Sequence, residues 1–379
     1  MRDKRLNCLG EVCESITYGV TASADFTSVV GPHLLRITDI TENGVFWETV
    51  PRCTVSKFDE ANSLLRDGDI VVARTGGTVG KSFLLSNPPH AVNASYLLRL
   101  RPNLGAIIPE YLSQFLGSQT YWSQLLEAAR GAAQPNVNAT MLSEVRLPLP
   151  SLDVQCQIAA RLKAQLAEVE TARQAAQVQL REITKLADSI IYDSIKKAVP
   201  TLRTLGDVLD EVKKGIGQGW KNYPVLGATR GGLAPAKEQP GKQAPKYKPA
   251  FPGTVFYNPM RILIGSIAFV DEDDTPGITS PDYVALRGKE DVVDSRWFYH
   301  WLRSPLGEQC ILSLARGAVR ERMLFNRLAE GVIELPGFAE QKKASAALKQ
   351  LRPLRRAIEQ QLREIDMLPQ KILAQAFEH

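Results

Sequence analysis

The chain has 379 residues, of which 44% are hydrophobic and 23% are charged, a composition typical of globular proteins. This composition excludes a largely disordered, collagen-like or membrane-embedded chain, and at about 100–200 residues per domain the length predicts two or three domains. Forty-six Lys and Arg against 41 Asp and Glu give a net charge of +5, which permits a nucleic-acid partner without requiring one.

The cysteines, histidines and apolar runs narrow the class of protein further. None of the five cysteines forms a CxxC pair and the four histidines lack metal-ligand spacing, so we expect reduced thiols and no metal site. The most apolar uncharged run, residues 262–270, is about half as long as the ~20 residues of a membrane span. No apolar segment follows the charged N-terminus, which argues against a secretory signal. These features predict a cytoplasmic protein.

An internal repeat organises the chain. Residues 129–132 and 315–318 both read Ala-Arg-Gly-Ala, and Gln155 and Gln341 are separated by the same interval. Weaker matches occur in the same order at nearly the same interval. Two copies of one unit are therefore predicted, each with a globular part and a helical part.

The globular part of each copy mixes strand-like and helix-like stretches. Short strands flanked by glycine, and then amphipathic helices, are predicted in corresponding places. The predicted strands are residues 69–73, 82–85, 254–257 and 262–270, and the predicted helices are residues 110–129 and 295–314.

A long helical pattern follows each globular part after a Leu-Pro pair. Its apolar residues recur in steps of three and four, which places them in one seam and favours a partner helix. Packing of each helix on its own globular domain is the alternative, but recurrence in both copies favours helix pairing. Pro353 and Pro369 predict a kink in the second helix. The predicted seam residues are Leu162, Leu166, Val169, Leu180, Ile183, Ile190, Leu348, Leu351, Ile358, Leu362, Ile365 and Ile372.

No catalytic constellation stands out in the sequence. Residues 76–82 resemble a phosphate-binding loop, but the first Gly is one residue too close to Gly80 and a strand follows where a helix should begin. Turn glycines are the better interpretation. The acidic run at residues 271–274 follows an apolar strand, and without a phosphate loop we interpret it as an acidic turn. The chain is predicted to be non-catalytic.

Basic and amide side chains lie in loops of both copies, where Lys and Arg could neutralise phosphate and Arg, Lys, Gln and Asn could read base edges. Solvated surface loops are the alternative for each cluster taken alone, and Arg130 and Arg316 could instead brace the fold. The DNA-contacting candidates are Arg130, Gln134, Asn136 and Asn138 in the first copy, and Lys214, Gln218, Lys221, Lys246, Lys248, Arg320 and Arg322 in the second.

Together these features resemble the specificity subunit of type I restriction–modification systems. The resemblance covers essentially the whole chain, and the ordered domain–helix–domain–helix plan is its most specific part. The first copy matches better than the second. The residues that carry it are 34–40, 68–76 with 79–81, 134–138, 147–150 with 155–158, and 372–377.

The resemblance implies an α/β (α+β) fold with two target-recognition domains, residues 1–150 and 200–337. Each domain would read half of an asymmetric bipartite DNA site. The central helix, residues 151–199, and the C-terminal helix, residues 338–379, would pair as an antiparallel coiled coil with pseudo-twofold symmetry and act as a spacer ruler. The resemblance adds Arg74, Thr75, Lys81 and Arg261 to the DNA-contacting candidates.

The resemblance also implies partners. Two methyltransferase (modification) subunits would carry the methyl donor S-adenosylmethionine, restriction subunits would join them, and this chain would hold no cofactor and no metal and contact no membrane. The organism would be a bacterium or an archaeon. A coiled-coil protein-interaction scaffold without DNA recognition is the alternative, and salt-dependent DNA binding by the assembled complex would separate the two.

Overall fold

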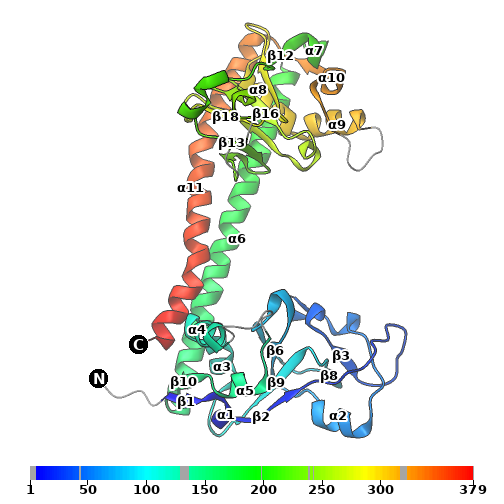
Figure 1. The fold of residues 1–379 in the computed structure, drawn as a ribbon, viewed down its shortest axis with the longest axis vertical. Helices are drawn as coiled ribbons and strands as arrows, with labels where there is room; N and C mark the ends of the chain where they lie inside the picture. The colour runs from blue at the N-terminus through cyan, green and yellow to red at the C-terminus, as the bar shows by residue number, and fades with distance from the viewer. Residues whose placement is uncertain are drawn as a thin grey trace. The chain divides into compact units, whose positions relative to one another are not determined.

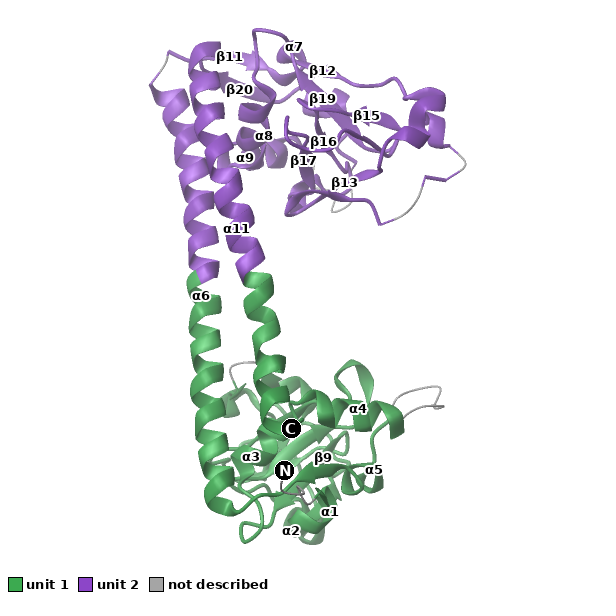
Figure 2. Ribbon diagram, turned by 90° about the vertical axis from the view of Figure 1, so that its left-hand side faces the viewer, with its two compact units in different colours: residues 1–175, 362–379 green, residues 176–361 purple. Residues whose placement is uncertain are grey.

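The computed structural model describes residues 6–41, 44–128, 136–197, 199–237, 240–241, 243–315 and 322–378. The chain divides into two compact units, with residues 1–175 and 362–379 in unit 1 and residues 176–361 in unit 2 (Figure 2). Each unit contains one globular part and a segment of each long helix. Among the described residues, none of the helices combines the length and apolar character needed to cross a membrane.

The globular part of unit 1 runs from residue 6 to residue 148. Its helices are α1 (Leu9–Val12), α2 (Lys57–Ser63), α3 (Pro109–Phe115), α4 (Gln119–Ala128) and α5 (Ala139–Ser143), with 3-10 turns η1 (Ile37–Asp39), η2 (Trp47–Thr49) and η3 (Gly76–Thr78). Its strands are β1 (Leu6–Cys8), β2 (Cys13–Tyr18), β3 (His33–Leu35), β4 (Ile40–Thr41), β5 (Gly44–Val45), β6 (Ile70–Ala73), β7 (Ser82–Leu84), β8 (Ala91–Asn93), β9 (Leu97–Pro102) and β10 (Arg146–Pro148).

The globular part of unit 2 runs from residue 201 to residue 335. Its helices are α7 (Leu205–Val208), α8 (Ser295–Arg303), α9 (Pro305–Leu314) and α10 (Phe325–Leu328), with 3-10 turns η4 (Gly217–Asn222), η5 (Ala244–Lys246) and η6 (Ile262–Ile264). Its strands are β11 (Thr201–Thr204), β12 (Leu209–Glu211), β13 (Leu226–Thr229), β14 (Gly232–Pro235), β15 (Lys248–Ala250), β16 (Val255–Tyr257), β17 (Ile267–Phe269), β18 (Gly277–Thr279), β19 (Val284–Gly288) and β20 (Val332–Leu335).

The two globular parts share one sheet topology. An antiparallel four-stranded sheet has the order β2-β9-β6-β7 in unit 1 and β12-β19-β16-β17 in unit 2. A separate antiparallel pair, β1 with β10 or β11 with β20, closes each domain. The central strands β6 and β16 are buried along their whole length, which explains their continuous apolar sequences. The mixed fold and the repeat predicted from the sequence are confirmed.

The units differ around this common sheet. Unit 1 adds a parallel pair, β3 with β8, whereas unit 2 adds the hairpin of β13 and β14 and an antiparallel pair, β15 with β18. Residues outside the shared sheet are therefore where the two copies have diverged.

Three predicted elements were wrong in detail. The single helix expected at residues 110–129 is two helices, α3 and α4, separated at residues 116–118. The helix expected at residues 295–314 is likewise interrupted at Ser304, because Pro305 starts a new helix and disfavours helical backbone in the residue before it. The strand expected at residues 262–270 begins as the 3-10 turn η6, and only β17 is extended.

The long helices are α6 (Leu152–Lys196) and α11 (Phe338–Phe377). Within each unit they lie side by side and run in opposite directions (Figure 1). Of the twelve predicted seam residues, Leu162, Val169, Leu348 and Ile365 are buried and the other eight are half-buried. Pro353 and Pro369 lie inside α11, which continues through both.

The helix ends also belong to the domain cores, so pairing and packing on the globular part both occur. In unit 1, Leu162, Leu373 and Phe377 join the core cluster formed by the sheet and α3. In unit 2, Ile191, Ile195 and Leu348 join the corresponding cluster around Trp297. These apolar contacts attach each domain to both helices.

Candidate nucleic-acid interface

In unit 1 the candidate residues converge where the turn between β6 and β7 meets the segment that precedes α5. The Val137 N–H donates to the Arg74 carbonyl oxygen at 3.0 Å, and the Val137 side chain is buried in the core. This bond brings Asn136 and Asn138 beside the turn at residues 74–81, which we call the unit 1 recognition turn. Five of the seven candidates in this copy therefore lie together, and Arg130 and Gln134 lie outside the described residues.

The unit 1 recognition turn is held rigidly. Gly76 and Gly80 have φ angles of +81° and +82°, a backbone region that favours glycine. The Tyr121 hydroxyl donates to the Gly80 carbonyl oxygen at 3.0 Å, and a Cβ on Gly80 would lie 2.5 Å from Leu125 Cδ2. Strand β7 begins at Ser82, so this segment is a braced turn followed by a strand, without the helix that a phosphate loop needs.

Arg74 is oriented by aromatic and backbone contacts that the sequence did not reveal. Its guanidinium carbon lies 4.7 Å from the centroid of the Tyr18 ring, a cation–π arrangement. The Arg74 N–H donates to the Tyr96 carbonyl oxygen at 3.1 Å, and Tyr18 and Tyr96 are 43% and 63% exposed. These tyrosines end one strand and precede another, so exposed aromatics at strand ends were the available signal.

The other unit 1 candidates differ in their freedom to contact a ligand. Lys81 and Asn136 are exposed, and Thr75 is half-buried. The Asn138 side-chain oxygen accepts the Met141 N–H at 2.8 Å and caps α5, a common role for Asn at this position. Its oxygen is therefore already engaged, and its amide N–H groups are the part left for recognition.

Unit 2 repeats the same junction with different residues. The Met323 N–H donates to the Pro259 carbonyl oxygen at 3.1 Å, and Met323 is buried as Val137 is. The bond places Arg322 beside the turn at residues 258–265, the unit 2 recognition turn, where Arg261 is exposed. Arg322 also lies 3.7 Å from Asp282, with both side chains more than half exposed, so this ion pair is weak. Arg320 lies outside the described residues.

The remaining unit 2 candidates gather around η4 and η5. The Ile216 N–H donates to the Tyr247 carbonyl oxygen at 2.8 Å, and a Cβ on Gly215 would lie 2.6 Å from the Pro245 oxygen. This close approach brings Lys214, Gln218, Lys221 and Lys246 onto neighbouring segments with exposed side chains.

Lys248 has a different environment from the other lysines. Its Nζ donates to the Tyr283 carbonyl oxygen at 2.6 Å and is half-buried. Burial lowers the pKa of Lys248, and the nearby Glu211 and Asp282 carboxylates oppose this effect. The ammonium group ties β15 to the loop at Tyr283, so Lys246 is the better placed of the two for phosphate.

Neither a metal-ligand cluster nor a disulfide is present in the part of the chain that the structure describes. It contains no group of three or more His, Cys, Asp or Glu side chains that could hold a metal ion. Its five cysteines are all free thiols.

Each globular part therefore presents a braced turn with polar side chains and is joined to segments of both long helices. Residues 1–179 match the family described as the type I restriction modification DNA specificity domain. Residues 1–179 are thus similar to the type I DNA specificity domain, in agreement with the resemblance seen in the sequence.

Individual relatives agree with this family. The chain is 24% identical over 194 residues to the type I restriction enzyme EcoBI specificity subunit of Escherichia coli, covering 50% of this chain and 40% of that protein. It is 28% identical over 141 residues to the MjaVIII specificity subunit of Methanocaldococcus jannaschii, covering 35% of this chain and 33% of that protein. The chain therefore spans less than half the length of these relatives.

The whole fold has a solved counterpart. A structure described as showing complex assembly and conformational transition of the type I R-M system matches with a TM-score of 0.65 at 19% identity, covering 98% of this chain and 97% of that chain. At this identity the match shows a shared fold.

Proposed function

We propose that this chain is the non-catalytic DNA-recognition subunit of a type I restriction–modification complex. Each unit reads one part of a bipartite, asymmetric site, and the α6–α11 pair sets the gap between the parts. The observation that carries the proposal is the repeated junction of recognition turn and following segment, Val137 on Arg74 and Met323 on Pro259, in a chain whose residues 1–179 match a DNA specificity domain.

The chemistry of the two turns suits DNA. Rigid turns hold their side chains before binding, which lowers the ordering cost of recognition. Lys81 in unit 1 and Arg261 and Arg322 in unit 2 are exposed cations that can neutralise phosphate, and Asn and Arg side chains can read base edges in the major groove. Because unit 1 offers Thr75 and Asn136 where unit 2 offers Arg261 and Arg322, the two half-sites should differ.

The match of residues 1–179 to a type I specificity domain supports the choice of partners. We propose that two modification subunits supply S-adenosylmethionine, flip the target adenine and transfer the methyl group, and that restriction subunits join the same assembly. The present chain then contributes site selection and spacing. A coiled-coil scaffold without DNA recognition is less well supported, because the family match of residues 1–179 is to a DNA specificity domain.

The test is DNA binding by this chain co-purified with its modification subunits, with modification subunits alone as the control. A complex that neutralises six or more phosphates should lose about a thousandfold in affinity between about 50 and about 200 mM salt. The complex should also bind more tightly than the control. Binding that is insensitive to salt, or equal with and without this chain, would contradict a recognition role.

A further inference from the structure

An acidic turn in unit 2 is folded around its own carboxylates. It follows β17 and contains Asp271, Glu272 and Asp274. The Asp271 N–H donates to Asp274 Oδ2 at 2.9 Å, and the Glu272 N–H donates to Asp271 Oδ1 at 2.7 Å. The Asp271 side chain is only 3% exposed. Buried carboxylates require partners, and two helices supply them.

Cations from α8 and α11 converge on this turn. Arg296 of α8 pairs with Asp271. On α11, Lys349 pairs with Glu272 at 2.6 Å and Arg352 pairs with Asp271 at 3.1 Å. Arg352 also pairs with Asp274, and Arg356 pairs with Asp274 at 3.0 Å. Steps of three and four place Lys349, Arg352 and Arg356 on one face of α11. We call these seven residues the ionic clamp: Asp271, Glu272, Asp274, Arg296, Lys349, Arg352 and Arg356.

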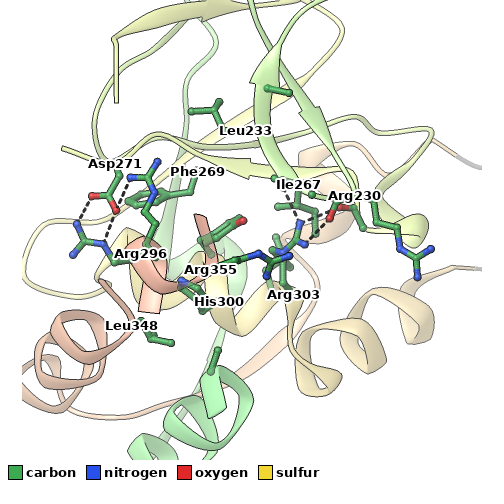
Figure 3. A pocket seen from close by; sticks show the side chains of 18 of the residues that line it. Arg230, Leu233, Ile267, Phe269, Asp271, Arg296, His300, Arg303, Leu348 and Arg355 are labelled. Atoms are coloured by element: carbon green, nitrogen blue, oxygen red, sulfur yellow. Dashed lines mark hydrogen bonds and ion pairs between the residues drawn. The ribbon is translucent and has the colours of Figure 1, made fainter. Parts of the chain in front are cut away.

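The unit 2 recognition turn precedes strand β17, and the acidic turn of the clamp follows the same strand. β17 (Ile267–Phe269) begins after the recognition turn and leads into the acidic turn. Helix α8 holds both ends: Arg296 binds Asp271, and Arg303 Nη1 donates to the Gly265 and Ile267 carbonyl oxygens at 3.1 and 3.0 Å. Figure 3 shows these two arginines at opposite sides of the cavity. A shift of the acidic turn on α11 would therefore move the recognition turn.

A cavity and apolar contacts lie next to the clamp. A cavity of about 1380 Å³ lies between the globular part and both helices of unit 2, with Phe269, His300 and Leu348 among its lining residues. Ala344, Leu348 and Leu351 of α11 pack on the unit 2 core, and the clamp extends the attachment along the same helix to Arg356. The charged contacts thus add to the apolar attachment of this helix.

Unit 1 has only a lysine, Lys163, in common with the clamp at the corresponding positions of the described residues. The residues that correspond to Lys349, Arg352 and Arg356 in the repeat are Lys163, Leu166 and Glu170 of α6. Leu166 packs against the unit 1 core, and Glu170 pairs with Arg173 of the same helix at 2.8 Å. The turn after β7 reads Ser-Asn-Pro-Pro at residues 86–89 and has no carboxylate. The clamp belongs to unit 2.

We propose that the ionic clamp sets the angle at which the unit 2 recognition turn is presented on the helix pair, so that its members are positioning residues for the half-site that unit 2 reads. This inference rests on the proposed function. It predicts that loosening the clamp reduces discrimination in one half-site and leaves the other unchanged, because the unit 1 recognition turn is braced separately by Tyr121 and Leu125.

The test compares two double variants of the full chain in the assembled complex. R352Q with R356Q removes two cations that reach the acidic turn. The control, K342Q with K343Q, removes the same charge from the same helix, but the partners of these residues, Phe338 and Glu340, lie on α11 itself. Binding is measured on the target duplex and on duplexes with one altered base pair in either half-site, after R261A has identified the half-site of unit 2.

A single mismatch normally weakens specific binding by about 5- to 150-fold. The clamp variant should lose about tenfold of that discrimination in the unit 2 half-site only, and R352K with R356K, which keeps both charges, should recover part of it. Hydrogen exchange of residues 266–275 should be faster in the clamp variant than in the control, with or without DNA.

Two results would overturn the proposal. Discrimination could be unchanged in the clamp variant, or could fall equally in both half-sites, as general destabilisation would produce. If the wild-type complex discriminates in neither half-site, the proposed function itself fails and the positioning role fails with it. Faster exchange at residues 266–275 would then still report the clamp as a structural attachment, which keeps the two failures distinct.

Discussion

The recognition turns of the two units share a backbone arrangement but are braced by different chemistry. In unit 1 the turn rests on aromatic and aliphatic side chains of α4, with Tyr121 bonded to the Gly80 oxygen. In unit 2 an arginine of α8, Arg303, bonds the carbonyl oxygens of Gly265 and Ile267. The sheet topology fixes where a turn is presented, and its support varies with the sequence that it must hold.

One buried glutamine shows what both units require. Gln155 accepts the Ile108 N–H at 2.9 Å and donates to the Ala106 and Pro150 oxygens. Gln341 accepts the Asp294 N–H at 3.0 Å and donates to the Val292 and Pro336 oxygens. Both side chains are fully buried. This repeated anchor joins the first turn of each long helix to its domain, so it belongs to the shared plan.

The largest expected effect comes from lengthening the helix between the units. Inserting four residues, about one helical turn, near Ala175 of α6 should lengthen the unspecified gap in the target and leave both half-sites unchanged. Binding to the original target should then be lost to the non-specific level. Selection of bound sequences from a random duplex pool measures both properties. Altered half-sites would contradict separate reading by the two units.

The second-largest effect is expected from replacing two aromatic residues that occupy the same place in the repeat. Tyr111 is buried and donates to the Pro148 oxygen, and Trp297 is buried and donates from Nε1 to Ser194 Oγ of α6. Each change to Ala should lower the free energy of unfolding of its own unit by about 3–5 kcal/mol. Urea unfolding read by hydrogen exchange separates the units. Equal loss in both units from either change would argue against independent cores.

Removing the glutamine anchor should lower the free energy of unfolding by a smaller amount, and by the same amount in each unit. Q155A and Q341A each leave a buried N–H and two carbonyl oxygens without this partner, which we expect to cost about 3 kcal/mol in the corresponding unit. The same urea experiment measures the two losses. Q174A, whose exposed side chain donates to Glu170 of its own helix, is the control. Losses that differ greatly between Q155A and Q341A would show that the anchor is not equivalent in the two copies.

Acidification should destabilise unit 2 more than unit 1, because only unit 2 has His300 at this place in the repeat. Burial, with Arg303, Arg296 and Arg355 nearby, lowers the pKa of His300 from 6.5 to about 3. An unfolded histidine takes up a proton near 6.5 while the folded one does not, so stability is complete above pH 6.5 and falls as the pH drops toward 3. Unit 2 should lose about 2 kcal/mol at pH 5.

The control for this prediction comes from unit 1, which has Gln114 at the place of His300 in the repeat. H300Q should remove the pH-dependent loss between pH 7 and pH 5, measured as the urea midpoint of unit 2. A loss of the same size in H300Q would assign the effect to other groups.

The smallest expected effects are on general DNA affinity. K81Q and K246Q should weaken binding to all sequences alike by less than about tenfold, and each should reduce the slope of log affinity against log salt by about one. Replacement of Gln134 should instead relax one half-site. Titrations at several salt concentrations on matched and mismatched duplexes distinguish these cases. A uniform loss from the Gln134 change would remove it from the base-reading candidates.

The sequence revealed the repeat, the two long helices and their seam because these features depend on spacing along the chain. It also singled out Gln155, Gln341 and the acidic run at residues 271–274. It did not reveal that this run clamps α11, since its partners Arg352 and Arg356 lie some 80 residues away in patterns typical of a solvated helix face. The stacking of Arg74 on Tyr18 was hidden for the same reason. Local periodicity reports helices and strands, whereas contacts between distant segments depend on tertiary packing.

The central claim is that this chain selects a two-part DNA site for its partners. The most direct measurement is methylome mapping of cells that express the modification subunits with and without this chain. We predict adenine methylation at a two-part motif with a fixed gap, only when the chain is present. Methylation that does not change when the chain is removed, or a modification subunit that co-purifies with the chain and methylates no such motif, would contradict the claim.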